Sequence, residues 1–528
     1  MKLNDILSGS YNAAEWESKG YRLPKFDIGA VRARTFARPA WVHFGGGNIF
    51  RAFPAAILNE ALNAGEYDRG VIVAETFDFE VIDKVYTPYG NLSLSVSLQS
   101  SGTIEKTVIA SVTEALKADY AFPDWERLKE IFRNPSLQMI SFTITEKGYS
   151  VSEADLDRGL EPVLAMGKVA ALLYERWQAG AFPLTVQSMD NCSHNGDKVK
   201  AGVLAYAKRW VADGLVPATF MTYLEDGKKV TFPWSMIDKI TPRPHEKVKE
   251  MLAADGFEDV GTIETGKHTF TAPFVNSEEV QYLVMEDNYA CGRPPLESGG
   301  ALFTTRETVD KVETMKVTTC LNPLHTAMSL YGCLLGYTLI SAEMKDPDIR
   351  LFIQKLGYME AMPVVTDPGV LNPYEFIGAV IGRRLPNPFM PDAPQRIAMD
   401  TSQKIPIRFG ETLKKYVARG LDMDNLVLIP LTLAGYARYL KGIRDDGTPF
   451  QPSPDPLLAE LMALVAPLEL GKPDQDWSCL KRLYGRKDIF AVDLYEIGLG
   501  ERIEGMVKEL YADTGAVRET LHKYVWER

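Results

Sequence analysis

Three consecutive glycines, Gly45, Gly46 and Gly47, interrupt the run "WVHFGGGNIFRAF" between a short apolar segment and a helix-forming stretch. A strand that turns into a helix through glycines exposes backbone N–H groups, and these groups can bind the pyrophosphate of a dinucleotide. Arg51 lies one helical turn beyond Gly47, where a guanidinium could close over the phosphate oxygens. The glycines could instead serve only tight packing, and Arg51 could be a solvated helix residue.

The next apolar run, "GVIVAETFDFE", supports the dinucleotide interpretation. It ends at Glu75, where a carboxylate can accept hydrogen bonds from the hydroxyls of an adenosine ribose. Asp78 and Glu80 follow closely, and no lysine or arginine lies between Arg69 and Lys84. Because this acidic stretch would repel a 2′-phosphate, the sequence predicts NAD rather than NADP as the cofactor.

The first three hundred residues alternate β-rich and helical stretches, which is typical of an α/β domain built on a mostly parallel sheet. The expected strands are residues 40–44, 70–76, 137–145 and 183–190, and residues 90–115 alternate like a hairpin. The expected helices are residues 50–65, 124–134, 159–180 and 197–214. From about Thr304 the sequence consists of long amphipathic stretches, and a Pro/Gly-rich junction precedes them at residues 291–300. We therefore expect a Rossmann-type domain over residues 1–300 and a mainly helical domain over residues 301–528.

Composition excludes several classes of function. The 528 residues are 46% hydrophobic and carry a net charge of −12, which argues against a nucleic acid or an anionic membrane as the main partner. No apolar run has the length of a membrane span and no secretion signal is apparent, so we expect a cytoplasmic protein. The five cysteines form no CxxC pair and the six histidines form no HExxH or HxH motif, so no bound metal is expected. Neither a GxSxG nor a GxxxxGK[ST] motif is present.

Seven sequence blocks occur in an order that resembles one enzyme family. "HFGGGNIFRAF" resembles HFGxGxFHRAH, "TITEKGY" resembles VTEGGY, and "SMDNCSHNG" resembles SCDNxxxNG. "TFPWSMIDKITP" resembles TFPNSMVDRITP, and "EDNYACGRPPLE" resembles EDxFxxGRPxWE. "LNPLH" stands where LNGSH or LNGAH is usual, and "DTSQKIP" resembles DGSQKLP. Across nearly its whole length, the chain thus resembles the long-chain mannitol dehydrogenase family.

The resemblance implies a reversible, NAD-dependent oxidation of a polyol to a ketose in a metal-free monomer. It assigns Lys316 as general acid and base, Asn191 and Asn322 as donors to the developing oxyanion, His325 as a substrate-positioning residue and Glu313 as a proton relay. These residue types suit the chemistry, because hydride loss from a secondary alcohol builds negative charge on oxygen and needs a proton acceptor and fixed donors. A lysine can accept the proton if burial lowers its pKa.

Each of these assignments has a structural alternative. Without the family pattern, Lys316 would be a solvated helix residue, His325 a core histidine, Asn191 an Asx-turn residue and Asn322 a helix cap. Glu313 could simply pair with Lys316. The chain departs from the family pattern at Trp234 and Pro323, and six positions rather than five separate Lys316 from Asn322.

The candidate site residues fall into two further groups. Those expected to bind the cofactor are Gly45, Gly47, Asn48, Arg51, Glu75 and Asp190. Those expected to bind the substrate are Arg384, Arg383 and Lys404, which would otherwise be surface residues.

These three cations favour a sugar-acid substrate, because a guanidinium binds a carboxylate through paired hydrogen bonds. We therefore expect fructuronate and its reduced form, mannonate, as the substrate pair. Mannitol with fructose, or tagaturonate, are the alternatives within the family. Outside it, an epimerase with tightly held NAD or a dinucleotide-binding redox sensor would fit the glycine turn.

Overall fold

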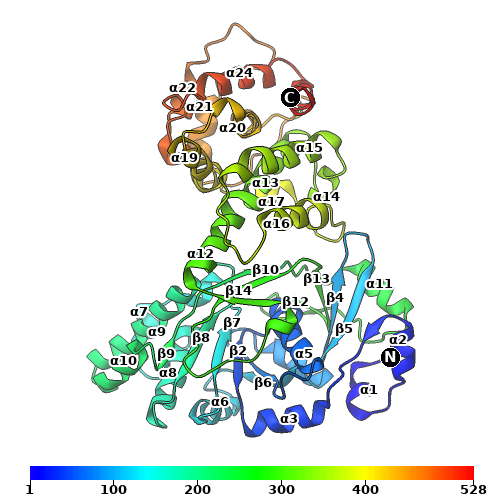
Figure 1. Cartoon of the computed structure of the whole chain (residues 1–528), viewed down its shortest axis with the longest axis vertical. Coiled ribbons are helices and arrows are strands. Elements are labelled where there is room, and N and C mark those ends of the chain that lie inside the picture. Colours follow the sequence, from blue (N-terminus) through cyan, green and yellow to red (C-terminus); the bar gives the residue numbers. More distant parts are fainter. Residues whose placement is uncertain (528) are drawn as a thin grey trace. The chain divides into compact units, whose positions relative to one another are not determined.

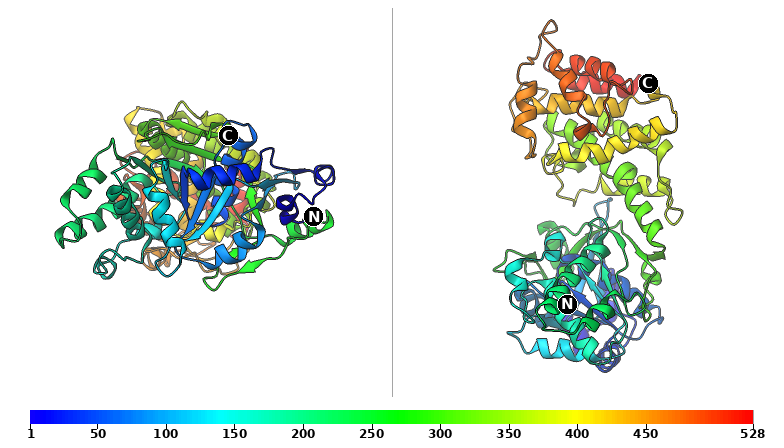
Figure 2. Two further views of the ribbon diagram at one scale, coloured as in Figure 1. Left: turned by 90° about the horizontal axis from the view of Figure 1, so that it is seen from below. Right: turned by 90° about the vertical axis from the view of Figure 1, so that its left-hand side faces the viewer.

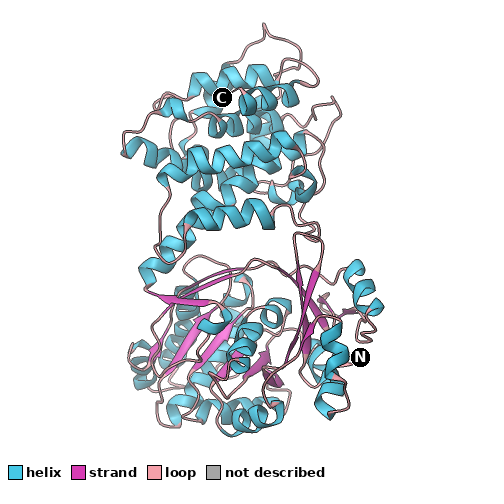
Figure 3. Ribbon diagram, turned by 45° about the vertical axis from the view of Figure 1, so that its right-hand side comes forward, coloured by secondary structure: helices cyan, strands magenta, loops and turns pink. Residues whose placement is uncertain are grey.

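The computed structural model describes residues 1–527 and divides into two compact units, Met1–Asp310 (unit 1) and Lys311–Arg528 (unit 2) (Figure 1). All strands of the described chain lie in unit 1, and unit 2 is helical (Figure 3). This arrangement confirms the predicted fold class. The boundary lies after Asp310 rather than after Gly300, because β15 (Ala301–Thr304) pairs in parallel with β14 (Tyr282–Glu286) and so stays in unit 1.

A six-stranded parallel sheet forms the centre of unit 1. Its order is β6-β3-β2-β7-β8-β9, which is the doubly wound order of dinucleotide-binding domains. The strands are β2 (Trp41–Phe44), β3 (Val71–Glu75), β6 (Val112–Lys117), β7 (Met139–Phe142), β8 (Leu184–Ser188) and β9 (Val230–Thr231). Every residue of β2, β3, β7 and β8 is buried, as continuous apolar runs in parallel sheets should be, and these four strands confirm the predicted ones.

Alternate residues of these strands enter two separate cores. Val42, Phe44 and Phe142 pack under α6 (Asp124–Arg133), α8 (Ala165–Gln178), α9 (Asn195–Ala212) and α10 (Ala218–Glu225). Trp41, Val73 and the other alternate positions pack against α5 (Pro54–Asn63) and the π-helical turn η1 (Ile82–Tyr86). The sheet therefore carries helices on both faces, and its strand order reverses between β2 and β7, where such sheets bind ligands.

Smaller sheets surround this centre. The predicted hairpin is present as β4 (Ser93–Leu98) and β5 (Ile104–Ile109), between β1 (Tyr21–Arg22) and β13 (Phe274–Glu278). β10 (Ser235–Asp238) joins β14 and β15, and β11 (Ile263–Glu264) pairs with β12 (Phe270–Thr271). The remaining α-helices of unit 1 are α1 (Leu3–Ser8), α2 (Ala13–Ser18), α3 (Ile28–Ala37), α4 (Asn48–Ala52), α7 (Glu153–Leu156) and α11 (Glu246–Ala254).

Unit 2 is built around two buried helices, α13 (Asn322–Leu334) and α20 (Leu428–Leu440). The Tyr331 hydroxyl of α13 donates to the Leu431 carbonyl of α20 at 2.9 Å. The other helices of unit 2, coloured from yellow-green to red in Figure 2, are α14 (Ile340–Glu343), α15 (Pro347–Lys355), α16 (Pro373–Ala379), α17 (Pro394–Ile397), α18 (Thr401–Ile405), α19 (Glu411–Ala418), α21 (Leu458–Val465), α22 (Ser478–Tyr484), α23 (Lys487–Phe490), α24 (Gly500–Leu510) and α25 (Ala516–Trp526). Among the described residues, no helix combines the length and apolarity that a membrane span requires.

Four helices of this region end in a π-helical turn. The α12 helix (Arg306–Met315), which connects the units, continues into η5 (Lys316–Cys320), and α15 continues into η6 (Leu356–Ala361). The α16 helix continues into η8 (Val380–Arg384), and α18 continues into η9 (Pro406–Gly410). η5 packs against η6, η9 and α13. Single π-helical turns are rare and often mark functional sites, and this cluster contains the predicted catalytic residue Lys316.

Candidate functional site

The glycine turn at the carboxyl end of β2 has different requirements at each position. Gly45 has φ +102°, and a Cβ there would lie 2.3 Å from the Thr143 carbonyl oxygen. A Cβ on Gly46 would lie 3.1 Å from the Tyr86 ring. At Gly47, by contrast, a Cβ would meet no atom within 4 Å. Gly45 and Gly46 are therefore required for packing, whereas Gly47 leaves open space over the backbone where a dinucleotide pyrophosphate would fit. The contacts of Gly45 and Gly47 with the cofactor stay predictions.

Glu75 fixes the turn from the neighbouring strand. Its Oε2 accepts the Gly46 N–H at 2.8 Å, and its Oε1 accepts the N–H groups of Thr76, Phe77 and Asp78 at 2.9, 2.9 and 3.3 Å. Four backbone donors thus use the acceptor capacity of one carboxylate. Glu75 organises the ends of β2 and β3, and its contact with the ribose hydroxyls stays a prediction.

Asn48 and Arg51 have partners that the sequence did not predict. The buried Arg51 guanidinium donates to the Ala272 carbonyl at 2.8 Å, to the Thr271 hydroxyl at 2.6 Å and to the Asn48 side chain at 2.9 Å. The Asn48 amide donates to the Phe270 carbonyl at 3.2 Å. Arg51 is therefore not an exposed clamp over the glycine turn, because it is buried against a segment more than two hundred residues away. Both side chains anchor the strand pair β11–β12, and their predicted contacts with the cofactor stay predictions.

Asp190 and Asn191 follow β8 at the same edge of the sheet. The Asp190 carboxylate accepts the N–H groups of Ile144 and Thr145 at 2.9 and 3.0 Å and the Tyr149 hydroxyl at 2.6 Å. Burial raises the pKa of Asp190 above its ordinary value, although these three donors oppose the shift. Asp190 thus joins the loops after β7 and β8, and the exposed Asn191 follows it directly. Their predicted contacts with cofactor and substrate stay predictions.

The other catalytic candidates lie along one continuous stretch of unit 2. Lys316 is the first residue of η5 and only 4% exposed, so it is not the solvated helix residue of the structural alternative. Asn322 begins α13, and His325 lies one turn later; both are half-buried. Glu313, one turn before Lys316 on α12, is half-buried as well. The π-helical turn therefore places a buried lysine immediately before the helix that carries the predicted oxyanion donor.

The predicted substrate-binding cations differ in their surroundings. Arg383 and Arg384 both lie in η8, where Arg383 is exposed and Arg384 is only 3% exposed. The Lys404 ammonium donates to the carbonyls of Ile397 and Met399 at 3.0 and 2.5 Å. Ile397 is the last residue of α17, and Met399 lies two residues beyond it. Burial lowers the pKa of Lys404, and the charge of nearby Arg408 adds to the shift.

Arg408 in η9 is a site residue that the sequence analysis missed. Its Nη1 donates to the Thr326 hydroxyl at 2.6 Å and to the Asn322 carbonyl at 3.3 Å. Burial lowers its pKa to about 10, and no ion pair to Arg408 occurs within residues 1–527. The signal was available in "SQKIPIRF", where Arg408 follows Lys404 by one turn. Arg408 supports the start of α13 and contributes a positive charge beside Asn322.

No metal site accompanies these residues in the described part of the chain, where no group of three or more His, Cys, Asp or Glu side chains could hold an ion.

Two family models together match most of the chain. The mannitol dehydrogenase Rossmann domain matches residues 39–297, and the mannitol dehydrogenase C-terminal domain matches residues 308–508. Among curated relatives, a D-mannonate oxidoreductase of Thermotoga maritima is 52% identical over 97% of both chains. A mannitol 2-dehydrogenase of Phaeosphaeria nodorum is 30% identical over 80% of this chain and 72% of its own.

Solved structures agree with the family models. A substrate-free D-sorbitol dehydrogenase superimposes with a TM-score of 0.77 at 25% identity, covering 96% of this chain and 97% of its own. A mannitol 2-dehydrogenase of Pseudomonas fluorescens, in a ternary complex with NAD and D-mannitol, gives a TM-score of 0.66 at 24% identity with the same coverage. These likenesses agree with the fold that the two family models indicate, a Rossmann domain followed by a C-terminal domain.

Proposed function

Since this chain belongs to the mannitol dehydrogenase family, we propose that it is an NAD-dependent oxidoreductase that interconverts fructuronate and D-mannonate. The observation that carries the substrate assignment is the 52% identity, over 97% of both chains, with a D-mannonate oxidoreductase. The three cations predicted to bind the substrate, Arg383, Arg384 and Lys404, support it, because a carboxylate needs a local positive charge in a protein whose net charge is −12.

The residues of unit 1 fit a dinucleotide. Gly47 leaves room over the backbone for the pyrophosphate, and Glu75 and Tyr86 keep the turn in place, since the Tyr86 hydroxyl donates to the Gly46 carbonyl at 2.9 Å. When bound, the nicotinamide supplies hydride transfer to or from the substrate carbon. The acidic residues after β3 favour NAD over its 2′-phosphorylated form.

The residues of unit 2 transfer the proton and stabilise the negative charge on the substrate oxygen. When the alcohol is oxidised, Lys316 takes the hydroxyl proton, and in the reverse reaction it returns that proton to the new alkoxide. Asn322 donates a hydrogen bond to the oxygen while it carries negative charge, and His325 orients the substrate. The family pattern implies the same donor role for Asn191. Arg384, Arg383 and Lys404 bind the substrate, its carboxylate included. Arg408 holds Asn322 in place through the backbone and Thr326.

The test is NADH oxidation, followed by absorbance, with fructuronate, tagaturonate and fructose as separate substrates. We expect rapid oxidation with fructuronate and at least about a hundredfold lower kcat/KM with fructose, because a neutral sugar leaves the carboxylate-binding charges unpaired. A higher kcat/KM with fructose or tagaturonate would replace the substrate assignment within the family. No oxidation with any of the three would contradict the proposal and favour the epimerase or sensor alternatives.

A further inference from the structure

The strand pair β11–β12 encloses a loop, residues 265–269, that is fastened to the edge of the Rossmann sheet from two sides. The Thr265 and Thr269 hydroxyls both donate to Asp78 Oδ2, at 2.6 and 2.5 Å. On the other side, Asn48 and Arg51 bind Phe270, Thr271 and Ala272. This segment, which we call the 263–271 hairpin, is thus fixed beside both the glycine turn and the loop after β3.

Phe77 lies in that loop and exposes an aromatic ring to solvent. It comes two residues after Glu75, its N–H is bound by the Glu75 carboxylate at 2.9 Å, and the residue is 67% exposed. Lys267 of the hairpin places its ammonium 5.0 Å from the centre of this ring. Within the described chain, Lys267 makes neither a hydrogen bond nor an ion pair, so its charge is available to a ligand.

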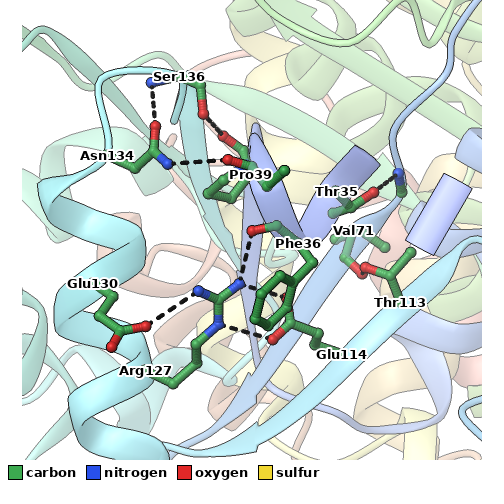
Figure 4. Close-up of polar contacts among 12 residues, drawn as sticks. Thr35, Phe36, Pro39, Val71, Thr113, Glu114, Arg127, Glu130, Asn134 and Ser136 are labelled. Carbon is green, nitrogen blue, oxygen red and sulfur yellow. Dashed lines mark hydrogen bonds and ion pairs between the residues drawn. The ribbon is translucent and has the colours of Figure 1, made fainter. Parts of the chain in front are cut away.

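Another exposed phenylalanine under a cation shows what a purely structural version of this pair looks like. Phe36 of α3 is 60% exposed, and the Arg127 guanidinium lies 4.1 Å from its ring centre. Figure 4 shows that this guanidinium is held by three residues. Arg127 donates to Glu114 through two hydrogen bonds of 3.0 Å, to Glu130 at 3.3 Å and to the Phe36 carbonyl at 3.1 Å. Lys267 has no such partners, and so the two pairs differ in the charge they leave unsatisfied.

Phe77 also lies on the side of the sheet that an adenosine would occupy. A dinucleotide crosses a doubly wound sheet at its switch point, here between β2 and β7, and its adenosine half extends toward the strand whose end carries the predicted ribose-binding residue. That strand is β3, which ends at Glu75. A flat, exposed ring two residues further on offers a stacking surface for a base.

We propose that Phe77 is the platform on which the adenine of the cofactor stacks, and that Lys267 binds the phosphate next to the adenosine. The inference rests on the proposed dinucleotide site but not on the identity of the sugar substrate. It gives the hairpin a function, since a segment far away in the sequence supplies the positive charge that the acidic loop after β3 lacks. Asn48 and Arg51 then act as positioning residues for Lys267.

The experiment measures dissociation constants by competition with NADH fluorescence, with AMP and adenosine as probes. We expect Phe77→Leu to weaken adenosine and AMP binding alike by about tenfold or more, and Phe77→Trp to retain both, because an aromatic face is what the base needs. Lys267→Ala should weaken AMP about fivefold and leave adenosine unchanged, since only AMP carries the phosphate. Phe36→Leu is the matched control and should change neither probe.

Unchanged AMP binding in a folded Phe77→Leu variant would overturn the proposal, and so would an equal loss in Phe36→Leu. Thermal unfolding of each variant shows whether it is folded. The outcome is separate from that of the substrate test. If the wild-type protein binds AMP through Phe77 but reduces no hexuronate, the proposed substrate is wrong and the adenine platform stands.

Discussion

The glycine turn of unit 1 and the π-helical cluster of unit 2 prepare for ligands in opposite ways. In unit 1 the polar side chains near the turn are used internally: Glu75 holds four backbone N–H groups and Arg51 is buried against β12. At the turn itself, the open backbone at Gly47 is what remains for the ligand. In unit 2 the candidate ligand-binding groups are side chains on or beside π-helical turns, such as Lys316 and Arg408. We therefore expect that a side chain added at the glycine turn weakens ligand binding there. In the π-helical cluster, we expect the same from removal of a charged side chain.

The largest effect is expected at Lys316. Lys316→Ala removes the proton acceptor and donor, and a general acid–base group typically contributes about 10²- to 10⁴-fold, so kcat should fall by about a thousandfold. NADH binding should persist, because the cofactor site lies in the other unit. Steady-state kinetics together with NADH fluorescence titration check both statements. A variant with an unchanged rate would support a redox sensor instead.

Gly45 and Gly47 should respond differently to the same substitution. Gly45→Ala places a methyl 2.3 Å from the Thr143 carbonyl at a φ of +102°, so it should destabilise the fold by more than about 2 kcal/mol. Gly47→Ala should leave the thermal midpoint nearly unchanged and raise the dissociation constant of NADH about tenfold, because the methyl fills the cradle. Thermal unfolding and NADH titration of both variants separate these outcomes. If Gly47→Ala bound NADH as tightly as the wild type, the pyrophosphate would not lie over Gly47.

We expect Arg408 to affect catalysis in two ways, through its positive charge and through its hold on Asn322. Arg408→Gln should lower kcat about tenfold, since the start of α13 loses its anchor, and Arg408→Lys should recover part of that loss because a cation remains. Comparison of kcat/KM for fructuronate and for fructose separates the two roles. Loss of the charge should affect only the acidic sugar, whereas loss of the hold on Asn322 should affect both sugars. If both variants kept the wild-type kcat, the positioning role would be wrong.

A smaller effect concerns the stability of the π-helical cluster. Glu360 in η6 caps α20 by accepting the N–H groups of Val427, Leu428 and Ile429 at 2.6–2.8 Å, and burial raises its pKa to about 7. A carboxyl whose pKa is raised by folding adds stability below its unfolded pKa and loses it as pH rises through 7. The unfolding free energy of the wild type, relative to Glu360→Gln, should thus fall by about 1–3 kcal/mol between pH 4.5 and pH 8. Denaturant titrations across this range would show no such trend if Glu360 were ionised throughout.

The regular elements were predictable because their signals are local. β2, β3, β7 and β8 are apolar runs of strand length, and the 90–115 hairpin alternates as a half-buried ribbon does. The roles of Arg51 and Asn48 were not predictable, since their partners at Phe270, Thr271 and Ala272 are distant in the sequence. The break at Phe53, between α4 and α5, does have a local signal in the proline after it.

The π-helical turns could not be predicted from the sequence pattern. A single extra residue in a helix rotates the side chains beyond it to a different face, yet the apolar spacing of α12 or α15 is that of an ordinary helix up to the turn. The roles of Lys316, Asn322 and His325 therefore came from the resemblance of whole sequence blocks, whereas their burial and the support from Arg408 came from the structure.

The central claim, that a hydride moves between NAD and the fructuronate carbonyl carbon, is tested most directly with isotope. The protein is incubated with fructuronate and NADH deuterated on the transferable position, and the mannonate is analysed by mass spectrometry. We predict one deuterium per mannonate and one NAD formed for each molecule of product. Unlabelled product, or product formed without net NADH consumption, would contradict it.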